Sequence, residues 1–395
     1  MYVSALTSKR LLEEIRVKTG KSPSFAVQKF TRLIVSGFVK NGKDIESLSS
    51  VPYASQYSTG LIASFGKEVE EGIKYNYIPS IRLSVLTNLS QVIYTFFKVF
   101  FWGLSDRKNR CLVGDVLNVS IGLSSLLAAR LAGIKAVGVV TDMPSLMLRG
   151  GSNRSLRLRM ADKLTEKYVS LYTDYVLLTD QMSNIVNPHH RPYVVMEGLA
   201  DSDFLKKNTL DLPKASPRIV MYAGGLHERY GLKTLVEAFS KLTMDDVQLL
   251  IYGTGPFVED LKCYALQDHR IVYGGTVSNE EIVLTEQKAT LLVNPRPTHE
   301  EFTKYSFPSK NIEYMASGTP LLTTKLPGMP LEYYSHVYLF EKEDVDGYYQ
   351  ALNEVLSKTN DELAKVGRSA REFITKNKNN TYQTKRILDF IEGRV

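Results

Sequence analysis

Short apolar runs alternate with longer amphipathic segments along the chain from about residue 111 onward. The runs are rich in β-branched residues, as buried strands are, and the segments between them repeat their apolar residues at the helical period. This alternation predicts parallel βαβ units, so we expect an α/β fold built on parallel sheets. The expected strands are Cys111–Val116, Ala136–Thr141, Tyr175–Leu178, Tyr193–Met196, Arg218–Tyr222, Gln248–Tyr252, Ile271–Tyr273, Thr290–Asn294, Leu321–Thr324 and Val337–Phe340.

The N-terminal part of the chain has a less regular pattern, with one helix predicted to begin near Ser22 and Pro23. Its apolar residues, among them Phe30 and Phe38, return at the helical period. The loop before it contains Lys21 and would present backbone N–H groups to an anion, but it lacks the spacing of a P-loop. We therefore expect an ordinary capped loop there.

The most apolar region runs from Ser84 to Trp102, and polar residues recur at helical spacing along one side of it. A membrane-spanning helix would rarely carry such a stripe. Two interpretations stay open: the helix packs in a domain core, or it lies in a membrane interface. A later basic cluster would provide the positive face that membrane contact requires. The stripe is Ser84, Thr87, Asn88, Gln91, Thr95 and Lys98, and the cluster is Arg149, Arg154, Arg157, Arg159 and Lys163.

The chain has 395 residues, enough for two domains that each bury a core of their own. The polar segment from Asp201 to Pro217 is the predicted hinge between them. A formal net charge of +7 favours anionic partners such as nucleotide diphosphates or anionic lipid. No DNA- or RNA-binding signature accompanies that charge, so nucleic acid is not an expected partner.

Cys111 and Cys263 are the two cysteines of the chain, and each lies in an apolar stretch. Buried free thiols are therefore expected rather than a disulfide, which fits a reducing compartment. The apolar part of the chain's start is too short for a secretory signal. We expect a cytoplasmic protein.

Three successive strands of the second half end in glycines: Gly224 and Gly225, then Gly253 and Gly255, then the pair at 274–275. In open parallel sheets, ligands bind at the carboxyl ends of strands, where glycine lets a phosphate or ribose approach the backbone. A single pair is ordinary turn chemistry. Three in a row predict a ligand crevice lined by backbone.

The segment from Tyr305 to Thr324 has the pattern of a loop, a short helix, a glycine stop and a buried strand. Pro308 and Ser309 suit a helix start, where backbone N–H groups attract an anion, and Lys310 adds a positive charge beside them. Gly318 predicts a left-handed stop before the strand. An anion-binding site is expected at the start of this helix.

This segment, with Glu313 on its helix, resembles the nucleotide-sugar-binding segment of the retaining glycosyltransferases of family 4, which have the GT-B fold. The resemblance covers most of residues 111–395, and Phe307 to Lys310 together with Glu313 resembles members associated with bacterial surface polysaccharides. It implies two Rossmann-like parallel-sheet domains facing a central cleft, an acceptor bound by the first and a nucleoside-diphosphate sugar by the second. It also implies that Lys310 faces the leaving diphosphate and Glu313 the ribose hydroxyls.

The resemblance is incomplete where the family brings two cations to the diphosphate. Gly225 stands at the usual arginine position and Tyr230 at the usual lysine position. Arg229 is then the nearest cation in this segment, and its alternative interpretation is an ordinary surface arginine.

The family's first glutamate is also missing, because Tyr305 stands eight positions before Glu313. The contact with the donor sugar would fall to the Tyr305 hydroxyl, or to Glu300 or Glu301 from the preceding loop. The donor-side candidates are Gly224, Gly225, Arg229, Gly253, Gly255, Glu301, Tyr305, Ser309, Lys310 and Glu313.

Candidates on the acceptor side lie in the first domain. Asp142 follows a strand and is expected to position the acceptor or to accept its proton, unless it only caps the turn. Glu197 and Gly198 follow a later strand and are expected to face the cleft, and Lys21 is the fourth candidate. Catalytic roles are expected of Asp142, Lys310 and Glu313.

Asp201 and Asp203 invite a metal interpretation, which we reject because their place matches the interdomain segment of GT-B proteins. Those proteins commonly need no metal for the leaving group. We therefore expect no metal and no cofactor beyond the nucleoside-diphosphate sugar used as donor substrate.

The pattern and the resemblance together predict an acceptor-side domain over residues 1–200 and a donor-side domain over 201–374, with helix 375–395 returning to the first. The expected function is retaining transfer of a sugar to a lipid-linked or saccharide acceptor, with peripheral contact at the inner membrane face. A nucleotide-sugar epimerase or phosphorylase is one alternative. A catalytically silent partner subunit is another.

Overall fold

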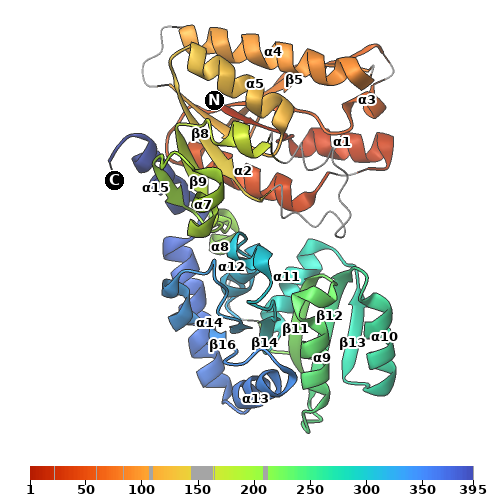
Figure 1. Cartoon of the computed structure of the whole chain (residues 1–395). Helices are drawn as coiled ribbons and strands as arrows, with labels where there is room; N and C mark the ends of the chain where they lie inside the picture. Colours follow the sequence, from red (N-terminus) through yellow and green to blue (C-terminus); the bar gives the residue numbers. More distant parts are fainter. Residues whose placement is uncertain are drawn as a thin grey trace. The chain divides into compact units, whose positions relative to one another are not determined.

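The computed structural model describes residues 1–395 except 22, 59, 83, 106–109, 144–162, 164, 208–211 and 395. The chain divides into two compact units (Figure 1). Unit 1 contains Met1–Leu199 together with Asn380–Val395, and unit 2 contains Ala200–Asn379. Most of the basic cluster expected near residue 150 lies outside the described residues, with only Lys163 among them.

Unit 1 is built on an eight-stranded sheet in the order β10-β9-β8-β7-β1-β2-β5-β4. Neighbouring strands are parallel except at the edge, where β4 runs antiparallel to β5. A two-stranded antiparallel sheet of β3 and β6 accompanies it. The strands are β1 (Tyr2–Ser4), β2 (Glu46–Ser50), β3 (Ile62–Ala63), β4 (Lys67–Glu70), β5 (Ile73–Ile78), β6 (Ser80–Ile81), β7 (Cys111–Asp115), β8 (Lys135–Val140), β9 (Asp174–Leu177) and β10 (Tyr193–Val195).

The unit 1 core lies between this sheet and helices from both ends of the chain. Ile15 of α1, Ile34 and Phe38 of α2 and Ile387 of α15 pack with Val137 of the sheet. Helices α4 and α5 lie side by side in the same unit (Figure 1). The helices of unit 1 are α1 (Lys9–Thr19), α2 (Phe25–Lys40), α3 (Ala54–Tyr57), α4 (Ser84–Leu104), α5 (Val119–Leu131), the 3-10 helix η1 (Asp180–Met182), α7 (Ser183–Val186) and α15 (Asn380–Ile391).

Unit 2 is built on a six-stranded parallel sheet in the order β13-β12-β11-β14-β15-β16. The strands are β11 (Arg218–Gly225), β12 (Val247–Thr254), β13 (Ile271–Gly275), β14 (Leu291–Asn294), β15 (Leu321–Thr323) and β16 (Tyr338–Leu339). The helices are α8 (Ser202–Lys207), η2 (Glu228–Tyr230), α9 (Leu232–Ser240), α10 (Val258–Gln267), α11 (Asn279–Lys288), η3 (Glu301–Lys304), α12 (Ser309–Ser317), η4 (Leu331–His336), α13 (Val345–Leu356) and α14 (Asn360–Asn377).

All ten predicted strands are present, within a few residues of the expected bounds, and the two parallel sheets confirm the predicted α/β class. The sequence pattern did not predict β1, β2 or β5 of unit 1. The expectation for the cysteines was half right. Both thiols are free, but Cys263 is exposed on α10 instead of buried, because the apolar residues around it turn a different face of the helix inward.

Candidate functional site

Helix α12 begins at Ser309, directly after Pro308, and ends at Gly318. Gly318 adopts the left-handed conformation with φ 81°, and the buried strand β15 follows, as predicted. The N–H groups in the first turn of α12 have no carbonyl of a preceding helical turn to which they could donate. These groups are next to Lys310, which is half-buried on the same turn.

Two buried contacts fix α12 against the sheet of unit 2. The Ala223 N–H of β11 donates to the Tyr314 hydroxyl at 2.8 Å, and Tyr314 is fully buried. The Asn294 side-chain amide of β14 donates to Asn311 Oδ1 at 2.6 Å, and both residues are buried. The start of α12 is thus held in position by hydrogen bonds that water does not reach.

The Lys310 side chain lies against the glycine end of β11. A Cβ placed on Gly224 would lie only 2.6 Å from the Lys310 Cε, so the lysine stem occupies the space that a side chain would need. A Cβ on Gly253 of β12 would lie 1.8 Å from the Gly224 carbonyl oxygen, in a backbone with φ 133°. The strand-end glycines therefore allow the two strands and the lysine to meet at one point.

The loop after β11 carries the other predicted cation. Arg229 donates to Glu300 at 2.8 Å, and its guanidinium lies 4.5 Å from the Phe302 ring centroid. Of the two glutamates proposed for the donor sugar, Glu300 is therefore engaged by Arg229, whereas Glu301 is exposed. Because an ion pair already binds Arg229, its charge is partly neutralised before any phosphate arrives.

A second arginine lies beside this loop and was not predicted as a site residue. The Arg296 guanidinium is 4.9 Å from the Tyr230 ring centroid and 5.3 Å from that of Phe302. Burial raises the pKa of Tyr222, and the positive charge of Arg296 acts against that rise, so this guanidinium is also near the Tyr222 phenol. Arg296 thus brings a cation to the loop position where the family resemblance expects a lysine and the chain has Tyr230.

The signal that would have found Arg296 is its place in the sequence. It follows β14 by two residues, at the carboxyl end of a central strand, where ligands of parallel sheets bind. Its proximity to Tyr230 depends on the packing of two distant segments, which no local pattern reports.

The remaining donor-side candidates occupy the same region of unit 2. Tyr305 is half-buried and directly follows η3, while Glu313 is half-buried on α12. Ser309 is exposed at the start of α12. Gly255 lies after β12, where a Cβ would be 2.2 Å from the Leu226 carbonyl oxygen.

The acceptor-side candidates come from separate segments of unit 1. Asp142 follows β8, and its Oδ1 accepts the N–H of the next residue, Met143, at 2.8 Å. Lys21 is exposed after α1, with its ammonium 5.8 Å from the Tyr53 ring centroid.

Glu197 and Gly198 are held by the C-terminal helix. Glu197 is buried, and its Oε2 accepts from Gln383 of α15 at 3.3 Å. The same Gln383 amide donates to the Gly198 carbonyl at 3.0 Å. These contacts fix the chain after β10 within unit 1.

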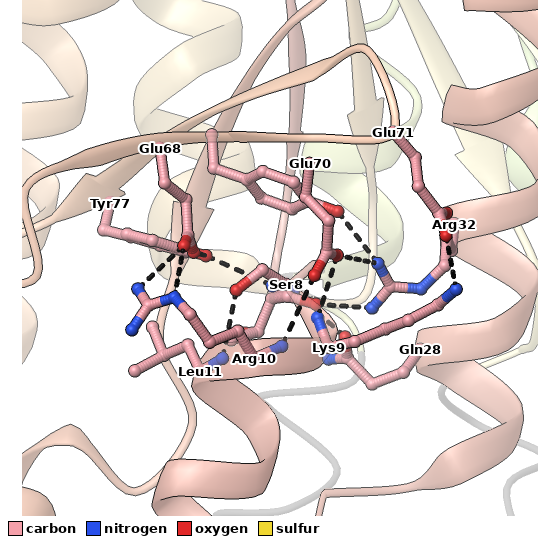
Figure 2. Close-up of polar contacts among 12 residues, drawn as sticks. Ser8, Lys9, Arg10, Leu11, Gln28, Arg32, Glu68, Glu70, Glu71 and Tyr77 are labelled. Atoms are coloured by element: carbon pink, nitrogen blue, oxygen red, sulfur yellow. Dashed lines mark hydrogen bonds and ion pairs between the residues drawn. The ribbon is translucent and has the colours of Figure 1, made fainter.

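A polar cluster near β1 was also missed by sequence reasoning (Figure 2). The Glu70 carboxylate accepts from the Lys9 N–H at 3.0 Å at the start of α1, and Arg32 contacts the same carboxylate at 3.2 Å. Glu68 accepts from Arg10 at 2.7 Å and from the Tyr77 hydroxyl. The chain's own acids thus occupy this helix start.

Hydrogen bonds within this cluster lower the pKa of the Glu68 carboxyl. Burial alone would raise its pKa, but hydrogen bonds from Ser8, Tyr77 and Arg10 hold the pKa below its ordinary value. The cluster joins residues far apart in the sequence, so no local sequence motif predicts it.

The Asp201 and Asp203 pair forms a local helix cap. Asp201 Oδ1 accepts the Asp203 N–H at 2.9 Å at the start of α8. Within the described part of the chain, no group of three or more histidines, cysteines or acids is arranged to hold a metal ion.

Comparison with known proteins gives a family for part of unit 2. Residues 217–358 match the family described as Glycosyl transferases group 1. A search of curated proteins found no match.

Solved structures similar to the whole chain share its fold. A sucrose-phosphate synthase from Thermosynechococcus elongatus is 13% identical with a TM-score of 0.63, and the match covers 100% of this chain and 99% of that one. HepE of Anabaena, in complex with UDP, is 11% identical with a TM-score of 0.62, covering 99% of each chain. A glycosyltransferase from Rickettsia africae is 15% identical with a TM-score of 0.64, covering 99% and 98%.

These similarities show that the two Rossmann-like units have the GT-B fold. With the glycosyl transferases group 1 domain in unit 2, the chain is a glycosyltransferase.

Proposed function

We propose that this enzyme transfers a hexose-type residue, with retention of anomeric configuration, from a nucleoside-diphosphate sugar to a lipid-linked or saccharide acceptor. The proposal includes membership of family 4 and a role in bacterial surface polysaccharide synthesis. One observation carries it: Lys310, on the first turn of α12, lies against Gly224 at the glycine end of β11.

The chemistry follows from what the donor requires. Negative charge grows on the diphosphate as the glycosidic bond breaks, so positive groups fixed in advance lower the barrier. Lys310 and the N–H groups of the α12 start supply such groups, beside the glycine end of β11. We therefore expect the leaving group to need no metal.

Arg296 is proposed as the second cation for the diphosphate. Its guanidinium lies 4.9 Å from the ring centroid of Tyr230, which stands where the resemblance expects a lysine. Arg229, which pairs with Glu300 at 2.8 Å, is the other candidate cation.

Glu313 is proposed to accept hydrogen bonds from the ribose hydroxyls. The donor sugar would be contacted by the Tyr305 hydroxyl or by Glu301. HepE has been solved with UDP, with UDP and glucose, and with UDP-glucose, which makes uridine donors the first to test here.

Asp142 is proposed to position the acceptor or to accept its proton, in unit 1. The reaction is placed at the inner face of the cell membrane, where a lipid-linked acceptor would be presented.

Product analysis tests the proposal against its rivals. The purified chain is incubated with a nucleotide sugar that binds it and with lipid-linked or free saccharide acceptors. Nuclear magnetic resonance then gives the anomeric configuration of the product. A glycoside that keeps the donor's configuration supports the proposal, and an inverted glycoside contradicts the retaining mechanism. A changed sugar nucleotide without glycoside would identify an epimerase, and sugar release to phosphate would identify a phosphorylase.

A catalytically silent partner subunit is the remaining candidate, favoured by Tyr305, Gly225 and Tyr230 at positions that the family usually fills with charged residues. Donor turnover by the isolated chain excludes it.

A further inference from the structure

Helix α4 exposes an apolar stripe along its length. Leu89, Ile93, Phe97, Phe101 and Leu104 follow one another at intervals of three or four residues, which places them on one face of the helix. Phe97 is 51% exposed and Phe101 is 64% exposed, although α4 packs against α5 on another side. Burial in a core therefore explains only part of this helix.

The surface beside the stripe is hollowed and also apolar. A groove of about 850 Å³ runs between α4 and the small sheet of β3 and β6, with Ile62, Pro79 and Trp102 among its lining. A second hollow of about 300 Å³ lies between α4 and α5, where Leu123 and Leu127 contribute. The apolar surface thus extends over α4 and α5, the two helices that lie side by side in Figure 1.

The charged residues on α4 and α5 are all positive. Neither α4 nor α5 contains an aspartate or glutamate, and their charged residues are Lys98 and Arg130. The Arg110 guanidinium lies 4.8 Å from the Trp102 ring centroid. The Lys98 ammonium pairs with Glu46 of β2 at 3.6 Å.

From this combination we propose that the face formed by α4 and α5 docks on the surface of an anionic phospholipid bilayer. An apolar face with aromatic residues and a basic rim binds in the plane of the headgroups, where acyl chains cover the apolar side chains and anionic lipid meets the cations. Among the described helices, none has both the length and the hydrophobicity needed to span a bilayer.

A second copy of the chain is a poorer occupant. In a twofold dimer the patch meets its own copy, so Lys98 and Arg130 would find no acid on α4 or α5 of the partner. A bilayer with anionic lipid supplies the opposite charge instead.

This inference deepens the proposed function, since an enzyme docked on a bilayer would meet a lipid-linked acceptor there. It is tested separately, because vesicle flotation requires neither donor nor acceptor. Failure of flotation would leave sugar transfer untouched, and failure of sugar transfer would leave flotation untouched.

The experiment is flotation of the full chain with vesicles of phosphatidylcholine containing about one third phosphatidylglycerol, and with vesicles of phosphatidylcholine alone. The variant is Phe97→Ser with Phe101→Ser. The matched control is Leu266→Ser with Leu331→Ser, two residues of unit 2 that are 89% and 79% exposed. We expect the wild type and the control to float with anionic vesicles, and the partition of the Phe variant to fall about tenfold or more.

A second variant tests the charge independently of the aromatic residues. Arg130 is exposed, and the variant Arg130→Glu is expected to weaken flotation with anionic vesicles while its unfolding transition stays unchanged. Flotation of neither the wild type nor the control, or equal flotation of the wild type and the Phe variant, would overturn the proposal. A wild-type dimer in analytical ultracentrifugation that is lost in the Phe variant, together with no flotation of the wild type, would also overturn the proposal.

Discussion

Replacing Lys310 by methionine is expected to lower turnover strongly while the enzyme stays folded. Methionine keeps an unbranched apolar stem in the space beside Gly224 and removes only the charge. Because Lys310 is half-buried, its interaction with a new unit charge about 4 Å away is worth roughly 4 kcal/mol at an effective dielectric constant near 20. Some of that interaction already exists with the bound donor, which carries phosphate charge before the bond breaks.

The part specific to the transition state is therefore about 3 kcal/mol, or roughly a hundredfold in kcat. Initial rates of sugar release from the nucleotide sugar, measured with saturating acceptor, give this number directly. The control is Lys325→Met, an exposed lysine of the same unit that pairs with Glu341. If Lys310→Met retains kcat within about threefold of wild type, the lysine does not stabilise the leaving diphosphate.

The other predictions concern the second cation and the stability of unit 2. Arg296→Gln should lower kcat/KM about tenfold or more, whereas Arg368→Gln, at an exposed position on α14, should leave it unchanged; equal rates for both would exclude a diphosphate role. Tyr314→Phe removes the acceptor of a buried N–H at Ala223 and should lower the free energy of unfolding in urea by about 1–3 kcal/mol, more than Tyr349→Phe does. Asp268→Asn should destabilise the protein at pH 7, because hydrogen bonds from Arg270 hold the pKa of Asp268 below its ordinary value. That difference in stability should shrink as pH falls below about 4, since the wild-type carboxyl becomes protonated and is then neutral like the asparagine. A difference that is constant with pH would contradict the assignment.

The parallel strands of the second half were predictable because they are buried on both sides and appear in the sequence as apolar runs. β1 was not, since its three residues give no periodicity, although the structure places it inside the unit 1 sheet between β7 and β2. α4 was predicted as a helix with two possible environments. Only the packing of α5 beside it shows which apolar residues stay exposed.

The candidate site was predictable where one segment holds it, as from Pro308 to Gly318. It was not predictable where distant segments meet. Arg296 reaches Tyr230 across two strand ends, and Glu70 reaches the start of α1 from β4. Such contacts are set by the sheet order, which the local sequence does not specify.

The most direct test of the donor site is a thermal-shift measurement against the uridine, guanosine, thymidine, adenosine and cytidine diphosphates and their common sugar conjugates. A ligand that binds only the folded protein raises its unfolding temperature. We predict a selective rise with one base and its loss in Glu313→Ala, which removes the proposed ribose contact from α12. No rise with any of these ligands would contradict nucleotide-sugar binding by unit 2.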